Sequence, residues 1–148
     1  MRERGKVMSN KFCFIEFENG VVVINTTPHE IAIQDMNGNV LMVPTSVLVN
    51  AAPVEVPYNN SGLFVTTEFH PTEGGQEVID SIRKEYDSLY PDNDKHKLVI
   101  IGSIIAAQAY PGQVAGMVPV PGFERVAPNE KRMRCDKFTM YPMVNKED

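Results

Sequence analysis

The feature that most constrains the fold is the stretch Lys97–Gly112, KLVIIGSIIAAQAYPG. Its four apolar residues Leu98–Ile101 end at a Gly-Ser pair, and a short helical pattern follows until Pro111-Gly112 stops it. This order predicts a buried strand that turns tightly into a short helix, with Ser103 as the N-cap. We expect the rest of the chain to pack around this unit as β-structure.

Alternating and β-branched runs predict strands along most of the chain. Asn19-Gly20 and Asn37-Gly38 are hairpin turn signals, and prolines at 44, 53 and 57 confine neighbouring strands to sheet edges or strand ends. The expected strands are 11–17, 21–24, 30–36, 39–43, 47–49, 54–56, 63–69, 97–101, 125–126 and 133–141.

One amphipathic helix is expected at 76–89, where apolar residues recur every three or four positions inside a charged insert, residues 71–97. The uncharged segment Gln113–Gly122 has no clear period and is expected to be a loop. The sequence therefore predicts an α+β fold, a mostly antiparallel β-sheet with two helices in a single compact domain. Residues 1–10 are expected to be a flexible tail, and residues 11–148 a domain of nucleotide-binding type.

Composition excludes several classes of protein. The net charge of −5 argues against a duplex nucleic acid binder, and no run approaches the ~18 apolar residues that a membrane span needs. The N-terminus lacks the apolar region of a secretory signal, so we expect a cytoplasmic protein. Cys13 and Cys135 have no CxxC or histidine-spaced partner, which fits reduced thiols and no metal site.

The charges are distributed unevenly. Residues 12–82 contain nine carboxylates and no Lys or Arg, whereas five cations fall within 13 residues near the C-terminus. These are Arg125, Lys131, Arg132, Arg134 and Lys137. Such a cluster in an acidic chain suits an anion site, although a solvated basic strand that balances the acidic half explains it too.

No catalytic motif is present. The histidines, His29, His70 and His96, are scattered and expected in solvent-facing loops, and GxSxG, HExxH, the Walker loop and GxGxxG are absent. We therefore predict no catalytic residue and no cofactor. The Gly-Ser turn at the start of the second helix, with the arginines, suits a protein that holds a nucleotide without converting it.

Several segments resemble a family of small phage proteins. They are VVVINTTPHEIAI (Val21–Ile33), the Asn-Gly hairpin, IIGSIIAAQAYPG (Ile100–Gly112) and the basic C-terminal strand. The chain is similar to phage anti-Thoeris sponges, which capture a cyclic ADP-ribose isomer and so silence a host defence. The resemblance implies a non-catalytic homo-oligomer, a dimer or hexamer, that works in the host cytoplasm. The insert 71–97 departs from the shorter members.

The resemblance and the charge map together suggest the site residues. Arg132 and Arg134, two apart on one strand face, are expected to pair with phosphate, with Arg125 as a third cation. Phe123 would stack on the purine, and Ser103 would contact a phosphate oxygen. Asn25 and His29 are candidates for ribose hydroxyls, although Asn-x-Thr-Pro-His equally fits a turn held by its own side chains. The loop 113–122 is a candidate lid.

Two other functions stay open. The chain could be a phosphoesterase-type enzyme that processes nucleotides, with His29 or His70 as the base. It could also be a structural or protein-interaction module of the virion that uses the apolar segment 113–122 as its contact surface.

Overall fold

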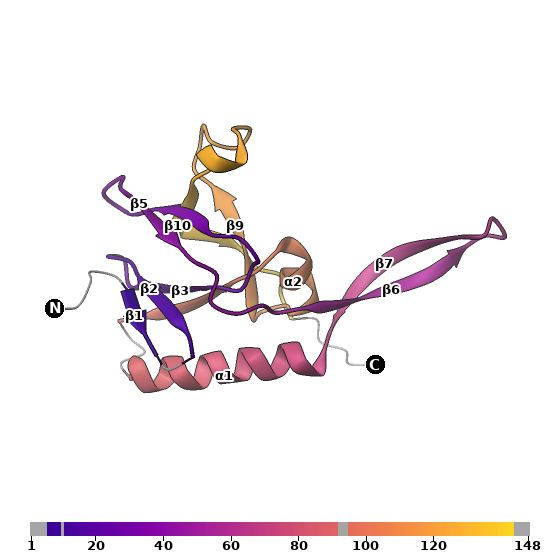
Figure 1. The fold of residues 1–148 in the computed structure, drawn as a ribbon, viewed down its shortest axis with the longest axis horizontal. Helices are drawn as coiled ribbons and strands as arrows, with labels where there is room; N and C mark the ends of the chain where they lie inside the picture. The colour runs from indigo at the N-terminus through magenta and orange to yellow at the C-terminus, as the bar shows by residue number, and fades with distance from the viewer. Residues whose placement is uncertain (1–5, 10, 92–94, 144–148) are drawn as a thin grey trace.

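A curled mixed sheet of eight strands forms the body of the molecule (Figure 1). The computed structural model describes residues 6–9, 11–91 and 95–143. The strand order is β1-β2-β3-β8-β9-β10-β4-β5, and a separate pair is β6-β7. The strands are β1 (Lys6–Met8), β2 (Cys13–Glu16), β3 (Val21–Asn25), β4 (Ile31–Gln34), β5 (Val40–Val43), β6 (Ala51–Tyr58), β7 (Leu63–Pro71), β8 (Lys97–Ile101), β9 (Val114–Pro119) and β10 (Met133–Thr139).

The centre of the sheet is the unit that the sequence predicted. β8 lies between β3 and β9 and runs parallel to both, and the short helix α2 (Ile104–Ala109) connects β8 to β9. Ser103 is the N-cap of α2, since its hydroxyl accepts the amide of Ala106 at 3.1 Å. The strand–turn–helix prediction for 97–112 is therefore confirmed.

Antiparallel hairpins flank this parallel centre. β1, β2 and β3 form one series, β4 and β5 form a hairpin, and β10 runs antiparallel to β9 but parallel to β4. Gly20 and Gly38 have φ values of 86° and 88° at the two predicted turns, a conformation that glycine adopts without steric cost. The α+β class and the mostly antiparallel sheet are confirmed.

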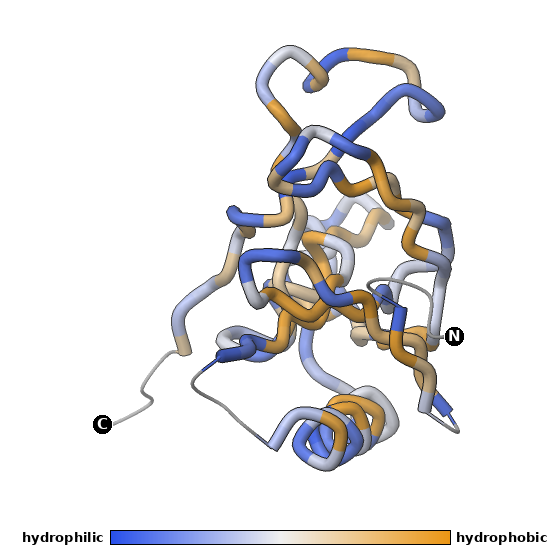
Figure 2. Tube along the Cα trace, turned by 90° about the vertical axis from the view of Figure 1, so that its left-hand side faces the viewer, coloured by the Kyte–Doolittle hydropathy of each residue, from blue (hydrophilic) through white to orange (hydrophobic). Residues whose placement is uncertain are grey.

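The long helix α1 (Glu73–Leu89) covers one face of the sheet. Figure 2 shows its hydrophobic side turned toward the strands, where Ile79 and Ile82 are fully buried. They join Phe14, Ile24 and Ile100 in one core cluster, and a second cluster fills the opposite face around Ile33 and Ile101. No helix in the described part of the chain is long and apolar enough to cross a membrane.

The strands β6 and β7 form an arm that projects from the body (Figure 1). Its base is held by Tyr110 of the α2 C-terminus, whose hydroxyl donates to the carbonyl of Asn50 at 2.6 Å and accepts the amide of Thr72 at 2.9 Å. The sequence predicts two strands here, 54–56 and 63–69, but the first is longer in the structure, since prolines 53 and 57 lie inside β6.

Four sequence expectations are wrong in detail. β1 lies within the expected tail and pairs with β2; residues 1–5 and 10 of that tail are outside the described residues. Segments 47–49 and 125–126 are not strands. The expected loop 113–122 contains β9, whose first residues Val114 and Ala115 are fully buried beside β8. The buried first half of segment 113–122 therefore forms neither a lid nor an exposed contact surface.

Candidate functional site

A buried amide shapes the segment that follows β3. The Asn25 side chain donates to the carbonyls of His29 and Val43 at 2.8 and 3.0 Å, and its Oδ1 accepts the amide and hydroxyl of Thr27 at 2.8 and 2.7 Å. Asn25 is 0% exposed. Its expected role at a ribose is therefore wrong: the amide is consumed in holding the turn, as the structural interpretation of Asn-x-Thr-Pro-His proposed.

This turn forms one wall of a cleft of 1090 Å³, which we call the Arg132 cleft. The floor comes from β4, β5 and β9, and the opposite wall from the loop around the 3-10 helix η1 (Pro128–Glu130). The lining residues are Thr27, Pro28, His29, Glu30, Ile31, Ala32, Val40, Met42, Ser103, Met117, Phe123, Pro128, Asn129, Glu130, Lys131, Arg132 and Met133. The volume is sufficient for a ligand of nucleotide size.

Arg132 and Phe123 meet in this cleft. The guanidinium carbon of Arg132 lies 4.9 Å from the centroid of the Phe123 ring, within range of a cation–π interaction. Its Nη1 donates to Oε1 of Gln34 at 3.3 Å, and within the described part of the chain no carboxylate pairs with it. An arginine fixed by a ring and an amide, with its charge unneutralised, is well prepared to bind an anion.

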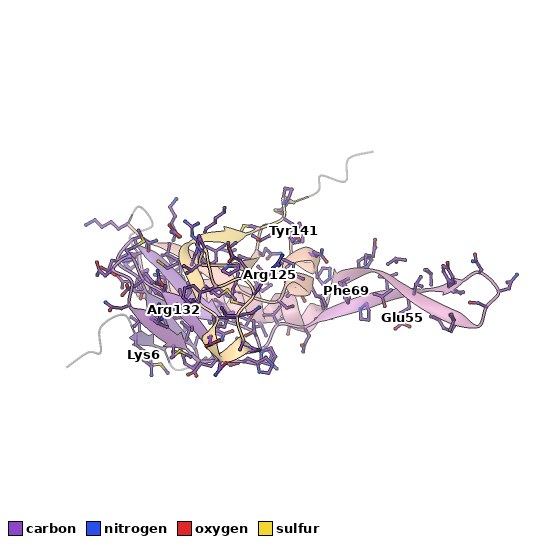
Figure 3. The ribbon with its side chains drawn as sticks, turned by 90° about the horizontal axis from the view of Figure 1, so that it is seen from above. Lys6, Glu55, Phe69, Arg125, Arg132 and Tyr141 are labelled. Atoms are coloured by element: carbon purple, nitrogen blue, oxygen red, sulfur yellow. The ribbon has the colours of Figure 1, made fainter. Side chains whose placement is uncertain are left out.

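The other two arginines lie elsewhere. Arg134 is paired with Asp136, through Nε at 2.8 Å and Nη2 at 3.0 Å, and lines a different hollow. The hydrogen bond from Arg134 lowers the pKa of Asp136 below its ordinary range. Arg125 is exposed beside Gly122 and Glu124, outside the Arg132 cleft (Figure 3). The expected convergence of three arginines on one anion is therefore wrong.

The separation of Arg132 and Arg134 has a local cause. β10 begins only at Met133, so Arg132 precedes the regular strand, and its carbonyl accepts the amide of Val120 at 2.9 Å. The rule that residues two apart share a strand face requires both residues to lie in the strand. Arg132 therefore turns to the cleft and Phe123, whereas Arg134 pairs with Asp136 within the strand.

Ser103 and His29 do reach the Arg132 cleft, and both are exposed. The Ser103 hydroxyl is occupied as an acceptor by the amide of Ala106, but it keeps a proton to donate. The helix behind it has only six residues, so its end contributes less positive potential than the sequence suggested. His29 projects from the turn that Asn25 holds.

The remaining histidines and the thiols lie away from the cleft. His70 is on β7 and contacts Glu68. His96 is half-buried, not solvent-facing as expected: its Nε2 lies 3.1 Å from Glu16, and its ring lies 4.8 Å from that of Tyr90. Among the described residues, no group of His, Cys, Asp or Glu side chains is placed to hold a metal ion.

Sequence reasoning missed much of the wall. Glu30, Glu130 and Lys131 share the cleft with Arg132, so its charges are mixed rather than purely cationic. The signal available was Ala127-Pro128, where proline opens the 3-10 turn that positions Glu130 and Lys131. Mixed charges mean that an anion would be held by directed contacts more than by a general positive field.

No protein-family model, no curated protein and no solved structure matches the chain.

Proposed function

We propose that the protein binds a cyclic nucleotide, of the class of cyclic ADP-ribose isomers, in the Arg132 cleft and sequesters it without cleaving it. The observation that carries the proposal is the contact of Arg132 with Phe123 at 4.9 Å inside a 1090 Å³ cleft. A guanidinium and a ring provide the two elements that nucleotides require, a cation for phosphate and flat surfaces for the base.

The other lining groups fit the remaining parts of such a ligand. His29 and Ser103 line the cleft, are exposed, and offer polar atoms for ribose hydroxyls and phosphate oxygens. Met42, Met117 and Met133 provide an adaptable apolar surface under the base. The resemblance to phage anti-defence sponges supplies the choice of a cyclic ligand, a cytoplasmic site of action and a homo-oligomeric state.

Sequestration suits this cleft better than turnover. A hydrolytic mechanism needs an activated nucleophile beside a base, or a metal-bound water. The Ser103 hydroxyl accepts from a backbone amide and has no described hydrogen bond to His29. The mixed rim also lacks the array of cations that stabilises a phosphoryl transition state.

The test separates a sponge from an enzyme. The pure protein is incubated with a cyclic ADP-ribose isomer, freed of unbound ligand and then heat-denatured, and the released material is identified by mass spectrometry. Intact ligand in a fixed molar ratio to protein is expected. Release of a linearised or hydrolysed product means an enzyme. The proposal is contradicted if the protein retains neither a cyclic ADP-ribose isomer nor a cyclic oligonucleotide.

A matched pair of variants links binding to the cleft. Arg132→Ala removes the cation in the Arg132 cleft, whereas Arg134→Ala removes a cation that Asp136 already neutralises. We expect Arg132→Ala to abolish ligand retention and Arg134→Ala to preserve it. If both variants retained the same amount of ligand, the ligand would bind outside the Arg132 cleft.

A further inference from the structure

The outer half of the β6–β7 arm extends into solvent away from the body (Figures 1 and 3). Leu63 and Phe64, near its tip, are 63% and 65% exposed, and Tyr58 is 52% exposed. A two-stranded ribbon is only marginally stable in water by itself, and three or more strands are needed for independent stability. The arm therefore has the size and composition of a sheet that is completed by another strand.

The two edges of the arm differ. A proline inside an edge strand lies with its nitrogen toward solvent. Pro53 and Pro57 therefore show that the odd-numbered residues of β6 direct their backbone groups outward. Because proline has no N–H group, the outer edge of β6 lacks two hydrogen-bond donors. On β7, Phe64 and Thr66 pair with Pro57 and Glu55 and so also direct their backbone groups outward. These two residues retain their N–H groups. The β6 edge is blocked to a further strand, and the β7 edge is open.

One face of the arm is apolar near the tip. Tyr58 pairs with Leu63, and Val56 pairs with Val65, so the four side chains share a face. Val56 and Val65 are each 38% exposed. An exposed apolar patch of this kind marks a surface that contacts another molecule.

We propose that the outer half of β7 pairs antiparallel with β7 of a second copy of this chain, about a two-fold axis at Val65. In this register Phe64 of each copy lies opposite the partner's Thr66, and the outward N–H and C=O groups of both residues find partners. The result is a four-stranded sheet, β6-β7-β7-β6. Its outer edges are the two proline-bearing β6 strands, so the assembly closes at two copies.

The chemistry of β7 favours a second copy over a foreign strand. Leu63–Thr67 has no charged residue, so it offers a charged peptide nothing to recognise. Glu68 is three residues from the axis, which places the two copies' carboxylates about 20 Å apart along the strands. That separation exceeds the screening length of about 8 Å at physiological salt, so like charges do not oppose the pairing.

The experiment measures the mass of the full chain by sedimentation equilibrium for the wild type and two proline variants. Thr66→Pro blocks the open β7 edge. Its control, Glu55→Pro, changes the residue paired with Thr66 and adds a proline to the edge that is already blocked. We expect twice the 16.5 kDa of one chain for the wild type and Glu55→Pro. Thr66→Pro should raise the dimer Kd at least about tenfold, since each copy loses an interstrand hydrogen bond.

Disulfide trapping tests the register without relying on proline. Val65→Cys places two thiols opposite each other at the axis, within the Cα separation that a disulfide allows. Val56→Cys, on the same face but on β6, leaves them too far apart. We expect a covalent dimer only for Val65→Cys. A wild type that stays at 16.5 kDa over a wide concentration range, or equal crosslinking of both cysteine variants, overturns the proposal.

Discussion

Asn25 illustrates how a single buried side chain sets the shape of a surface site. Its amide makes hydrogen bonds to residues at 27, 29 and 43, and so fixes the path of the chain from β3 into the cleft wall. The spacing Asn-x-Thr-Pro-His fits both a ligand contact and a self-held turn. Burial decides between them, because a fully buried amide does not reach a ligand.

Replacement of Asn25 should therefore affect stability first. Asn25→Ala leaves the Val43 carbonyl and the Thr27 amide without their partner in a buried setting, at ~1–3 kcal/mol for each unsatisfied group. We expect the free energy of unfolding, measured in urea, to fall by about 3 kcal/mol or more. Asn37→Ala, at an exposed asparagine on the β4–β5 turn, is the control and should change little. Similar midpoints for the two variants would mean that the Asn25 network is not stabilising.

The two thiols should be unreactive in the native state. Burial raises the pKa of Cys13 and Cys135 above the ordinary value of 9.0, and both side chains are buried. A raised native pKa stabilises the fold below pH 9, and this contribution is lost as the pH rises through the native pKa. A thiol reagent at neutral pH should modify neither cysteine until urea is added. Rapid modification of the folded chain would contradict this burial.

At the scale of elements, the start of α1 shows why two adjacent glycines are not equivalent. Thr72 caps the helix by accepting the amide of Gly75 at 2.9 Å, and Gly75 packs against the hydroxyl of Tyr110. A side chain on Gly75 would overlap that hydroxyl and approach the Asn50 carbonyl to 2.8 Å, whereas a side chain on Gly74 meets nothing within 4 Å. This contact joins α1, α2 and the base of the arm.

The two glycines give opposite predictions. Gly75→Ala should destabilise the protein by about 1–3 kcal/mol, because the tight contact with Tyr110 must open. Gly74→Ala should be neutral or stabilising by up to about 1 kcal/mol, since alanine is the better helix former. Thermal unfolding of both variants in the same buffer shows whether each substitution raises or lowers the stability. A loss of the same size in both would show that the Tyr110 packing is not the cause.

Local patterns identified the elements whose partners are close in sequence. β8, the turn at Ser103 and α2 follow from their own residues, as do the hairpin turns at Gly20 and Gly38. β9 was missed because its burial comes from β8 and β10 on either side, not from a period of its own. The length of β6 was underestimated because prolines are tolerated in an edge strand, where their nitrogen faces solvent.

For the molecule as a whole, the site could be predicted only where residue chemistry and position coincide. Arg132 and Phe123 of the β9–β10 connection, Ser103 and His29 come together from three separate segments, and the sequence predicts them from charge, aromaticity and turn position. The prediction for Arg134 is wrong because Arg134 forms an ion pair with Asp136. The sequence alone does not show which charged side chains pair with each other.

The helix of the charged segment 71–97 lies away from the candidate site. α1 lies along one side of the sheet, and the loop that carries η1 rises from the opposite side (Figure 1). No residue of α1 lines the Arg132 cleft. The helix of this charged segment therefore lies on the other side of the sheet from the proposed binding cleft.

The most direct measurement is calorimetric titration of a cyclic ADP-ribose isomer into the wild type, Arg132→Ala and Arg134→Ala. We predict tight binding by the wild type and by Arg134→Ala. Arg132→Ala should lose ~2–5 kcal/mol, the cost of removing a cation from a charge-paired anion. Undetectable binding by the wild type, or an equal loss in both variants, would contradict a nucleotide held at Arg132.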